Sequence, residues 1–142
     1  MLTLIRAGLV LVLLMYAVPV LAQTPTPVTV TSRVVFTPSI DHAAVDSFSR
    51  EIVTHYELEV IGQNGLGAIA FTKGLGKPAP NPQGEIDVVV QEFGGLVVDA
   101  VHKAAVSAVG PGGMGRSALS NPFGRPGPVR TPTAPTNLTV VS

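Results

Sequence analysis

Residues 101–120 read VHKAAVSAVGPGGMGRSALS, and they predict an antiparallel hairpin. From His102 to Val109 the side chains separate by parity: one side is mostly small and apolar and the other is mixed, as in a strand with one buried face. The glycine-rich segment after Val109 predicts a tight turn, and the residues after it predict a return strand. The pattern therefore indicates a β protein organised around this hairpin.

A helix is the competing interpretation, because apolar residues from Leu96 to Ala108 also fall near a 3.6-residue repeat. The β-branched valines in this segment lower its helix propensity, and Gly94-Gly95 is a poor start for a helix. The residues favour the strand.

The segment Gly110–Gly115 matches the pattern G-x-G-x-x-G, which can mark a dinucleotide site after a strand. That chemistry needs a helix that begins at the last glycines and faces the pyrophosphate. Here Pro122 follows soon afterwards, and no Asp or Glu occurs after Asp99 to bind a ribose. We therefore expect a turn at this point and no cofactor.

Residues 1–22 predict a secretory signal peptide. They carry one charge, Arg6, then an apolar run over 8–18, and the small residues that a signal peptidase needs end at Ala22. A retained membrane anchor is the alternative, because the span is just long enough to cross a bilayer. We expect a secreted, periplasmic or cell-surface protein that meets the membrane only through this segment during export.

Composition limits the function classes further. Without the first 22 residues the chain keeps 8 basic residues (9 less Arg6) and 9 acidic ones, so no basic surface indicates nucleic-acid binding. The chain has no Cys, so burial alone must stabilise an exported fold. About 120 residues suffice for a single domain.

Other segments predict further strands. The clearest alternation lies at 55–60, where Tyr56, Leu58 and Val60 are expected to point inward. The remaining expected elements are a linker at 23–27, strands at 28–30, 33–37, 68–71 and 85–90, a loop at 39–51, a turn at 64–65, a Pro-rich crossing at 77–82 and a turn, with a short helical turn as one form, at 91–99.

The C-terminal region is expected to leave the domain. Residues 124–133 are rich in Pro and Gly and predict a stiff linker. Residues 134–142 resemble the first strand of a second module. Either the chain is a piece of a longer repeat protein, or this tail returns as an added edge strand.

In order, these segments resemble a fibronectin type III module of an exported bacterial protein, over residues 28–123. The matching pieces are RVVFTPS at 33–39, HYELEV at 55–60 and, best, AAVSAVGPGG at 104–113 followed by RSA at 116–118. The resemblance implies an immunoglobulin-like antiparallel β-sandwich of about seven strands, usually with a binding or spacer role.

Two positions depart from the family. Phe36 stands where the family commonly has Trp, and His102 stands where it usually has a corner Tyr whose hydroxyl bonds to nearby backbone. We interpret His102 as a partly buried structural substitute whose imidazole N–H makes a similar bond. A ligand or pH-sensing role is the alternative.

The sequence contains no established metal or catalytic pattern. His42 and His55 flank the 39–51 loop, whereas His102 begins a strand at the other end, so the three cannot share an ion. The spacing of Asp41, His42 and His55 is unlike known zinc sites. There is no G-x-S-x-G, no Cys and no H-E-x-x-H, so we expect neither a bound metal nor enzyme activity.

In the resembling fold the loops 39–51 and 111–114 lie at the same end, and loops on a rigid scaffold are where recognition tends to lie. The candidate partner-binding residues are Asp41, His42, Asp46, Arg50 and Met114. The expected function is a non-catalytic extracellular interaction or spacer module that contacts a protein or a cell-surface polymer. An accessory carbohydrate-binding module is the alternative, but the chain has no Trp, and Tyr56 is its only Tyr outside the signal peptide.

Overall fold

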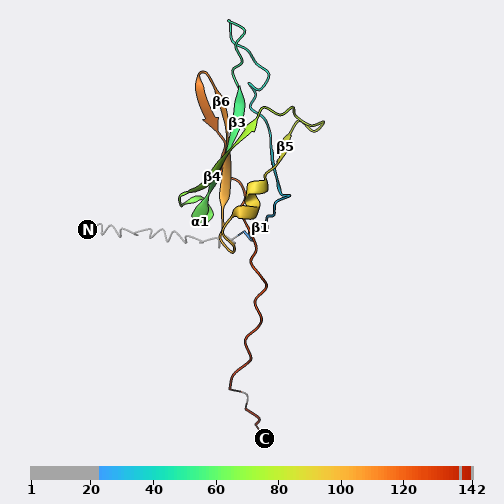
Figure 1. Cartoon of the computed structure of the whole chain (residues 1–142), viewed down its shortest axis with the longest axis vertical. Coiled ribbons are helices and arrows are strands. Elements are labelled where there is room, and N and C mark those ends of the chain that lie inside the picture. The colour runs from blue at the N-terminus through green and yellow to red at the C-terminus, as the bar shows by residue number, and fades with distance from the viewer. Residues whose placement is uncertain (1–22, 138, 142) are drawn as a thin grey trace, which may run out of the picture.

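The computed structural model describes residues 23–137 and 139–141, and these form a β-rich fold with almost no helix (Figure 1). The signal-peptide prediction for residues 1–22 lies outside the described residues. Within them, no helix is long and apolar enough to cross a membrane.

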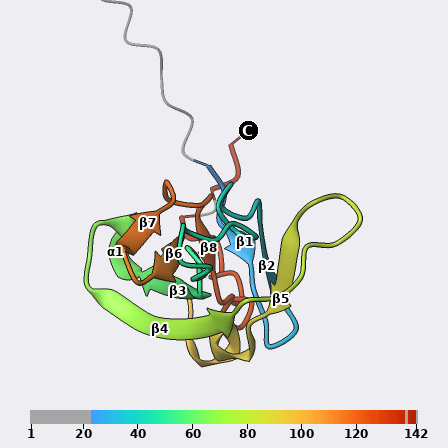
Figure 2. The ribbon, with the colours of Figure 1, turned by 90° about the horizontal axis from the view of Figure 1, so that it is seen from above.

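The strands form three sheets (Figures 1 and 2). A four-stranded antiparallel sheet has the order β4-β3-β6-β7, β2 pairs antiparallel with β5, and β1 pairs in parallel with β8. The elements are β1 (Thr26–Pro27), β2 (Arg33–Phe36), β3 (His55–Ile61), α1 (Gly62–Gly65), β4 (Ile69–Gly76), β5 (Ile86–Val89), the 3₁₀ helix η1 (Gln91–Gly95), β6 (Lys103–Gly110), β7 (Gly113–Arg116) and β8 (Phe123–Gly124).

The hairpin predicted from the first quoted residues is confirmed, and the helical alternative is wrong. Strands β6 and β7 pair antiparallel and meet at Gly110 and Gly113, so Pro111 and Gly112 form the turn. Gly113 has a φ of 124°, a conformation that a side chain would disfavour. The G-x-G-x-x-G pattern is therefore a turn.

The return strand differs from the prediction of a strand at 116–118, because β7 ends at Arg116. Beyond it, Ser117 donates its N–H to the Val106 carbonyl at 2.9 Å and accepts the Val106 N–H on its hydroxyl at 3.0 Å. Ser120 does the same with Ala104, at 2.8 and 2.9 Å. The two serines are three positions apart and their partners only two, so hydroxyl groups replace a regular ladder along this edge of β6.

The alternation of β3 is confirmed, since Tyr56, Leu58 and Val60 are all buried. The turn after it is also confirmed: Gln63 and Asn64 adopt φ values of 50° and 55°, which Asn tolerates well. The return strand β4 is longer than the predicted 68–71. It pairs with β3 from Tyr56 to Ile61, and the register of this pairing shifts once near each end.

The N-terminal region reverses two expectations. Strand β1 lies inside the predicted linker 23–27, and the predicted strand 28–30 turns back instead. Thr26 and Val28 donate their N–H groups to the carbonyls of Pro122 and Gly124, at 3.0 Å each. Pro25 and Pro27 have no N–H and alternate with Thr26 and Val28. The N–H groups of Thr26 and Val28 therefore lie on the same edge of the segment, where they can pair.

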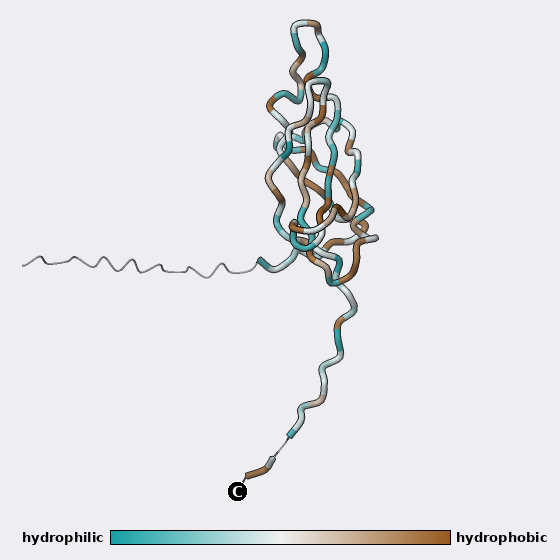
Figure 3. Tube along the Cα trace, turned by 90° about the vertical axis from the view of Figure 1, so that its left-hand side faces the viewer, coloured by the Kyte–Doolittle hydropathy of each residue, from teal (hydrophilic) through white to brown (hydrophobic). Residues whose placement is uncertain are grey.

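One apolar core is shared by the two-stranded β2-β5 pair and the four-stranded sheet. Its most deeply buried side chains are Tyr56, Leu58, Val60, Ile86 and Val90. The burial of Ile86 and Val90, with Asp87 and Val89 exposed, confirms the predicted alternation of 85–90. In Figure 3 hydrophilic residues, in teal, occur on the loop that protrudes beyond the body. The sheets thus present the 39–54 connection at one end of the molecule.

Candidate functional site

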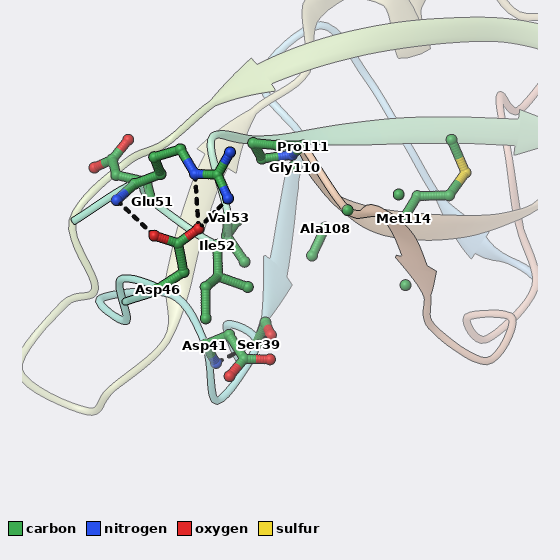
Figure 4. A pocket seen from close by; sticks show the side chains of 14 residues that line it. Ser39, Asp41, Asp46, Glu51, Ile52, Val53, Ala108, Gly110, Pro111 and Met114 are labelled. Carbon is green, nitrogen blue, oxygen red and sulfur yellow. Dashed lines mark hydrogen bonds and ion pairs between the residues drawn. The ribbon is translucent and has the colours of Figure 1, made fainter. Parts of the chain in front are cut away.

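A hollow lies at that end of the molecule, between the 39–51 loop and the β6-β7 turn (Figure 4). We call it the end hollow; its volume is about 530 Å³. Four of the five candidate residues line it, namely Asp41, Asp46, Arg50 and Met114. The structure therefore brings the two predicted loops together.

Close backbone packing holds the two walls of the end hollow in place. A Cβ on Gly110 would lie 1.8 Å from the carbonyl oxygen of Ile52, so only glycine fits at this point. Next to it, the Thr54 N–H and hydroxyl both donate to the Val109 carbonyl, at 2.8 and 3.1 Å. The end of β6 thus fixes where the loop returns to β3.

Asp46 and Arg50 close the tip of the loop. One Asp46 carboxylate oxygen accepts the N–H groups of Phe48 and Arg50 at 2.8 and 3.0 Å, and the other accepts the Arg50 Nε–H at 2.7 Å. The guanidinium also lies over the Phe48 ring, 5.4 Å from its centroid. The side-chain bond from Arg50 and then its backbone N–H lower the pKa of Asp46.

This lowered pKa predicts a pH-dependent loop tip. Because the folded pKa of Asp46 lies below the unfolded value, its stabilising effect is present above about pH 4 and is lost as the pH falls through the folded pKa. We expect the amide proton shifts of Phe48 and Arg50 to titrate at this low pKa in NMR spectra. Asp46→Asn should abolish that titration and Asp41→Asn should preserve it. A midpoint at or above the ordinary Asp value would contradict the interpretation.

Two acidic residues of the end hollow differ from Asp46 in their partners. Glu51 accepts a bond from the Lys77 ammonium at 3.1 Å. Asp41 forms no ion pair with any residue that the structure describes. Met114 lines another part of the same hollow, and its side chain is exposed, with 67% of its surface accessible. The end hollow therefore combines an uncompensated carboxylate with an apolar contact.

His42 was predicted to belong to the same patch, but it is not among the residues that line the end hollow. Its Nδ1 lies 2.9 Å from the hydroxyl oxygen of Tyr56, and the two rings stack with centroids 5.8 Å apart. The same hydroxyl accepts the Ser39 N–H at 3.2 Å. Tyr56 sits near the start of β3, so its hydroxyl reaches the base of the loop and draws His42 toward the core.

The remaining histidines are also occupied in structural contacts. His55 lies 3.0 Å from the Thr54 hydroxyl and 3.2 Å from the Glu57 carboxylate. No group of three His, Cys, Asp or Glu side chains in the described part of the chain is arranged to hold a metal ion.

His102 is buried, with 4% of its surface exposed, and its ring stacks on Phe123 at a centroid distance of 6.1 Å. Its backbone pairs with that of Phe123. The expected imidazole bond to nearby backbone is not made: Nδ1 has no hydrogen-bond partner among the residues at 23–137 and 139–141. The ring lies against Phe123, so stacking, rather than a hydrogen bond from Nδ1, holds the imidazole in place.

Glu51, Ile52 and Ala108 also line the end hollow, although they were not among the predicted site residues. Ala108 was assigned to the inner side of its strand, and no local pattern indicated that it would face a loop. Ile52 carries no periodic signal, because it follows an irregular loop.

Comparison with protein-family models, with curated proteins and with solved structures finds no match for this chain.

Proposed function

We propose that this chain is an exported, non-catalytic interaction module with a fibronectin type III-like sandwich, and that it binds a partner protein at the end hollow. The strand order supports this fold. In immunoglobulin-like sandwiches strands C, F and G share one sheet and strands B and E the other. Here β3, β6 and β7 are neighbours in one sheet and β2 pairs with β5.

The observation that carries the proposal is the meeting of two loops around one hollow on a well-packed scaffold. Met114 presents an exposed thioether, and methionines are adaptable contacts at binding surfaces. Asp41 adds a negative charge that no described residue neutralises. A partner that fits this surface presents a basic side chain beside an apolar one.

The lining favours a protein over a carbohydrate. Sugars are commonly bound against exposed aromatic rings, and no aromatic residue lines the end hollow. The exposed Phe48 on the loop tip lies under the Arg50 guanidinium. The carbohydrate-binding alternative therefore has no platform here.

A capture experiment tests this proposal. The chain from Gln23 is immobilised and exposed to the extracellular and envelope proteins of its source, and bound proteins are quantified by mass spectrometry. We expect the double variant Asp41→Asn, Met114→Ser to capture about tenfold less of the partner, because it loses a charge contact and a buried apolar contact.

Leu66→Ser is the matched control, because Leu66 is 89% exposed just after α1, at the opposite end of β3 from the end hollow. It should capture the partner as the wild type does. Equal losses in both variants would contradict binding at the end hollow. Binding on a glycan array that the double variant abolishes would favour the carbohydrate alternative.

A further inference from the structure

The end hollow continues along β7 into a second hollow. This second hollow, of about 260 Å³, lies between the end of β2 and residues 115–117. Ser39, Ala108 and Gly115 line both hollows, so the two meet at these residues. Together they extend beside β7 from Gly113 to Arg116, and we call them the β7 groove.

One edge of β7 is free. It is the last strand of the four-stranded sheet, and its other edge bonds β6, as shown by the Ser117 N–H, which donates to the Val106 carbonyl at 2.9 Å. Backbone groups alternate in direction along a strand, so those of Gly115 also point toward β6 and those of Met114 and Arg116 point away from it. No loop or side chain in the described part of the chain bonds these outward N–H and carbonyl groups. This edge is therefore available to an added strand.

The inner face of β7 carries no side chain. Gly115 pairs with Ala108, which packs against the core, so Gly115 lies on the inner side of the sheet. Gly113 has the same parity and faces the same way. No described atom lies within 4 Å of a Cβ built on either glycine. Side chains of a strand added to this edge would therefore find open space beside them.

The free edges of β2 and β4 differ in this respect. Strand β2 pairs only with β5, and β4 is the first strand of the four-stranded sheet. On β2 the side chains of Val34 and Phe36 pack against the core, and on β4 those of Phe71 and Leu75 do so. Among these three strands, β7 is thus the one whose inner face leaves room for side chains of a partner.

The two halves of the β7 groove differ in polarity. The half beside Gly115 includes four side chains with apolar surface, namely Phe36, Tyr56, Val106 and Ala108. Arg116 also lines this half, but its guanidinium bonds the Glu59 carboxylate at 2.7 Å. The half beside Gly113 is the end hollow, where Asp41 has no ion-pair partner among the residues that the structure describes. The groove therefore complements an apolar side chain followed by a basic one.

We propose that the partner of the end hollow binds as an extended strand that pairs antiparallel with the free edge of β7. This inference rests on the proposed function, because it describes how the same hollow is occupied. Side chains two residues apart face the same side of a strand. The partner places an apolar side chain opposite Gly115 and, two residues later, a basic side chain opposite Gly113. Its backbone bonds the outward groups of Met114 and Arg116.

An NMR titration of the chain from Gln23 with the end-capped peptide TVTVTKT tests this. In the proposed register the second valine of the peptide lies opposite Gly115 and its lysine lies opposite Gly113. We expect saturable shifts of the Met114 and Arg116 amide signals. The peptide with glutamate in place of lysine should bind about fivefold more weakly or worse, because it meets like charge. Asp41→Asn should narrow this difference between the two peptides.

Backbone methylation of the peptide tests whether the contact is a strand. The N–H groups of its third and fifth residues would bond β7, so N-methylation there should weaken binding about tenfold or more. The N–H groups of the fourth and sixth residues would point away from β7. N-methylation at those two positions is the matched control and should leave binding within about threefold of the unmodified peptide.

Gly115→Val tests the open inner face of β7. The added side chain has space in the free protein and would occupy the place of the apolar side chain of the partner, so peptide binding should fall about tenfold or more. Gly74→Val is the matched control. Gly74 lies in β4, at the opposite edge of the same sheet, and no described atom lies within 4 Å of its added Cβ. This variant should bind the peptide as the wild type does, and circular dichroism should show both variants folded.

Several results would overturn the proposal. These are the absence of saturable shifts, equal binding of the two N-methylated peptides, and shifts that centre on β2 or β4. Shifts of the β7 amides that depend on protein concentration without peptide would assign the edge to a second copy and would also overturn it.

The capture experiment separates this inference from the proposed function. If Gly115→Val captures the partner as the wild type does, while Asp41→Asn, Met114→Ser loses it, binding at the end hollow stands and the strand is excluded. If no protein is captured but TVTVTKT binds with the expected N-methyl pattern, the free edge of β7 is confirmed as a strand-binding site and the proposed function fails.

Discussion

Gly110→Ala is expected to destabilise the fold by about 3 kcal/mol, although it adds a single methyl group. The new Cβ would lie 1.8 Å from the Ile52 carbonyl oxygen and 2.9 Å from its carbon, and these are backbone atoms that cannot rotate away. Either β6 or the 52–54 segment must move, and the Thr54 bonds to Val109 would be strained or lost. Thermal unfolding should show a Tm lower by roughly 10 °C or more.

Gly112→Ala is the matched control for this prediction. It lies in the same turn, no atom lies within 4 Å of its added Cβ, and its φ is not in the left-handed range. We expect its free energy of unfolding to stay within about 0.5 kcal/mol of the wild type. If the two alanine variants unfolded alike, the close approach between Gly110 and Ile52 would be wrong.

The same variant tests the end hollow, because Gly110 holds one wall of that hollow against the other. Gly110→Ala should therefore reduce partner capture even under conditions in which the protein remains folded. Gly112→Ala leaves the walls in place. Capture that is unaffected by Gly110→Ala in folded protein would separate partner binding from the geometry of this hollow.

Leu58→Ala is expected to cost about 2–5 kcal/mol of stability, the range for a large-to-small change at a fully buried position. Leu58 is 0% exposed at the centre of β3, the strand that has neighbours on both sides. The cavity would open in the core that the four-stranded sheet shares with the β2-β5 pair. Chemical denaturation should show a lower midpoint with little change in slope.

Ile40→Ala provides the comparison, because it removes a β-branched side chain that is 99% exposed. Its effect on the free energy of unfolding should be within about 0.5 kcal/mol. A small effect of Leu58→Ala would mean that the β2-β5 pair does not cover this face of β3. That result would argue against the shared core and against the proposed sandwich together.

Much of the local structure could be predicted because successive side chains of a strand face opposite sides of the sheet, so burial of one side produces an alternating sequence pattern. Over Tyr56–Val60 of β3 apolar and charged residues alternate, and the structure buries the apolar set and leaves the charged set partly exposed. In the β6-β7 turn the glycines lie where a tight reversal needs them. These signals depend on residues within a few positions of each other.

The candidate site was partly predictable for a different reason. Its two loops were placed together by the expected strand order, and the end hollow confirms that placement for Asp46 and Met114. His42 was assigned to the patch because it lies in the 39–51 loop. In the structure His42 instead contacts the hydroxyl of Tyr56. This contact joins an irregular loop to a buried strand, and no sequence periodicity indicates it.

The sequence alone thus determined which side chains of a strand face inward and where the turns lie, because both depend on the chemistry of adjacent positions. Only the tertiary structure decided three other features: the close approach of Gly110 to Ile52, the pairing of β1 with β8 and the free edge of β2. These depend on where irregular connections place segments that are distant in the chain. Their free energy comes from packing and backbone bonds that exist only once the sheets have assembled.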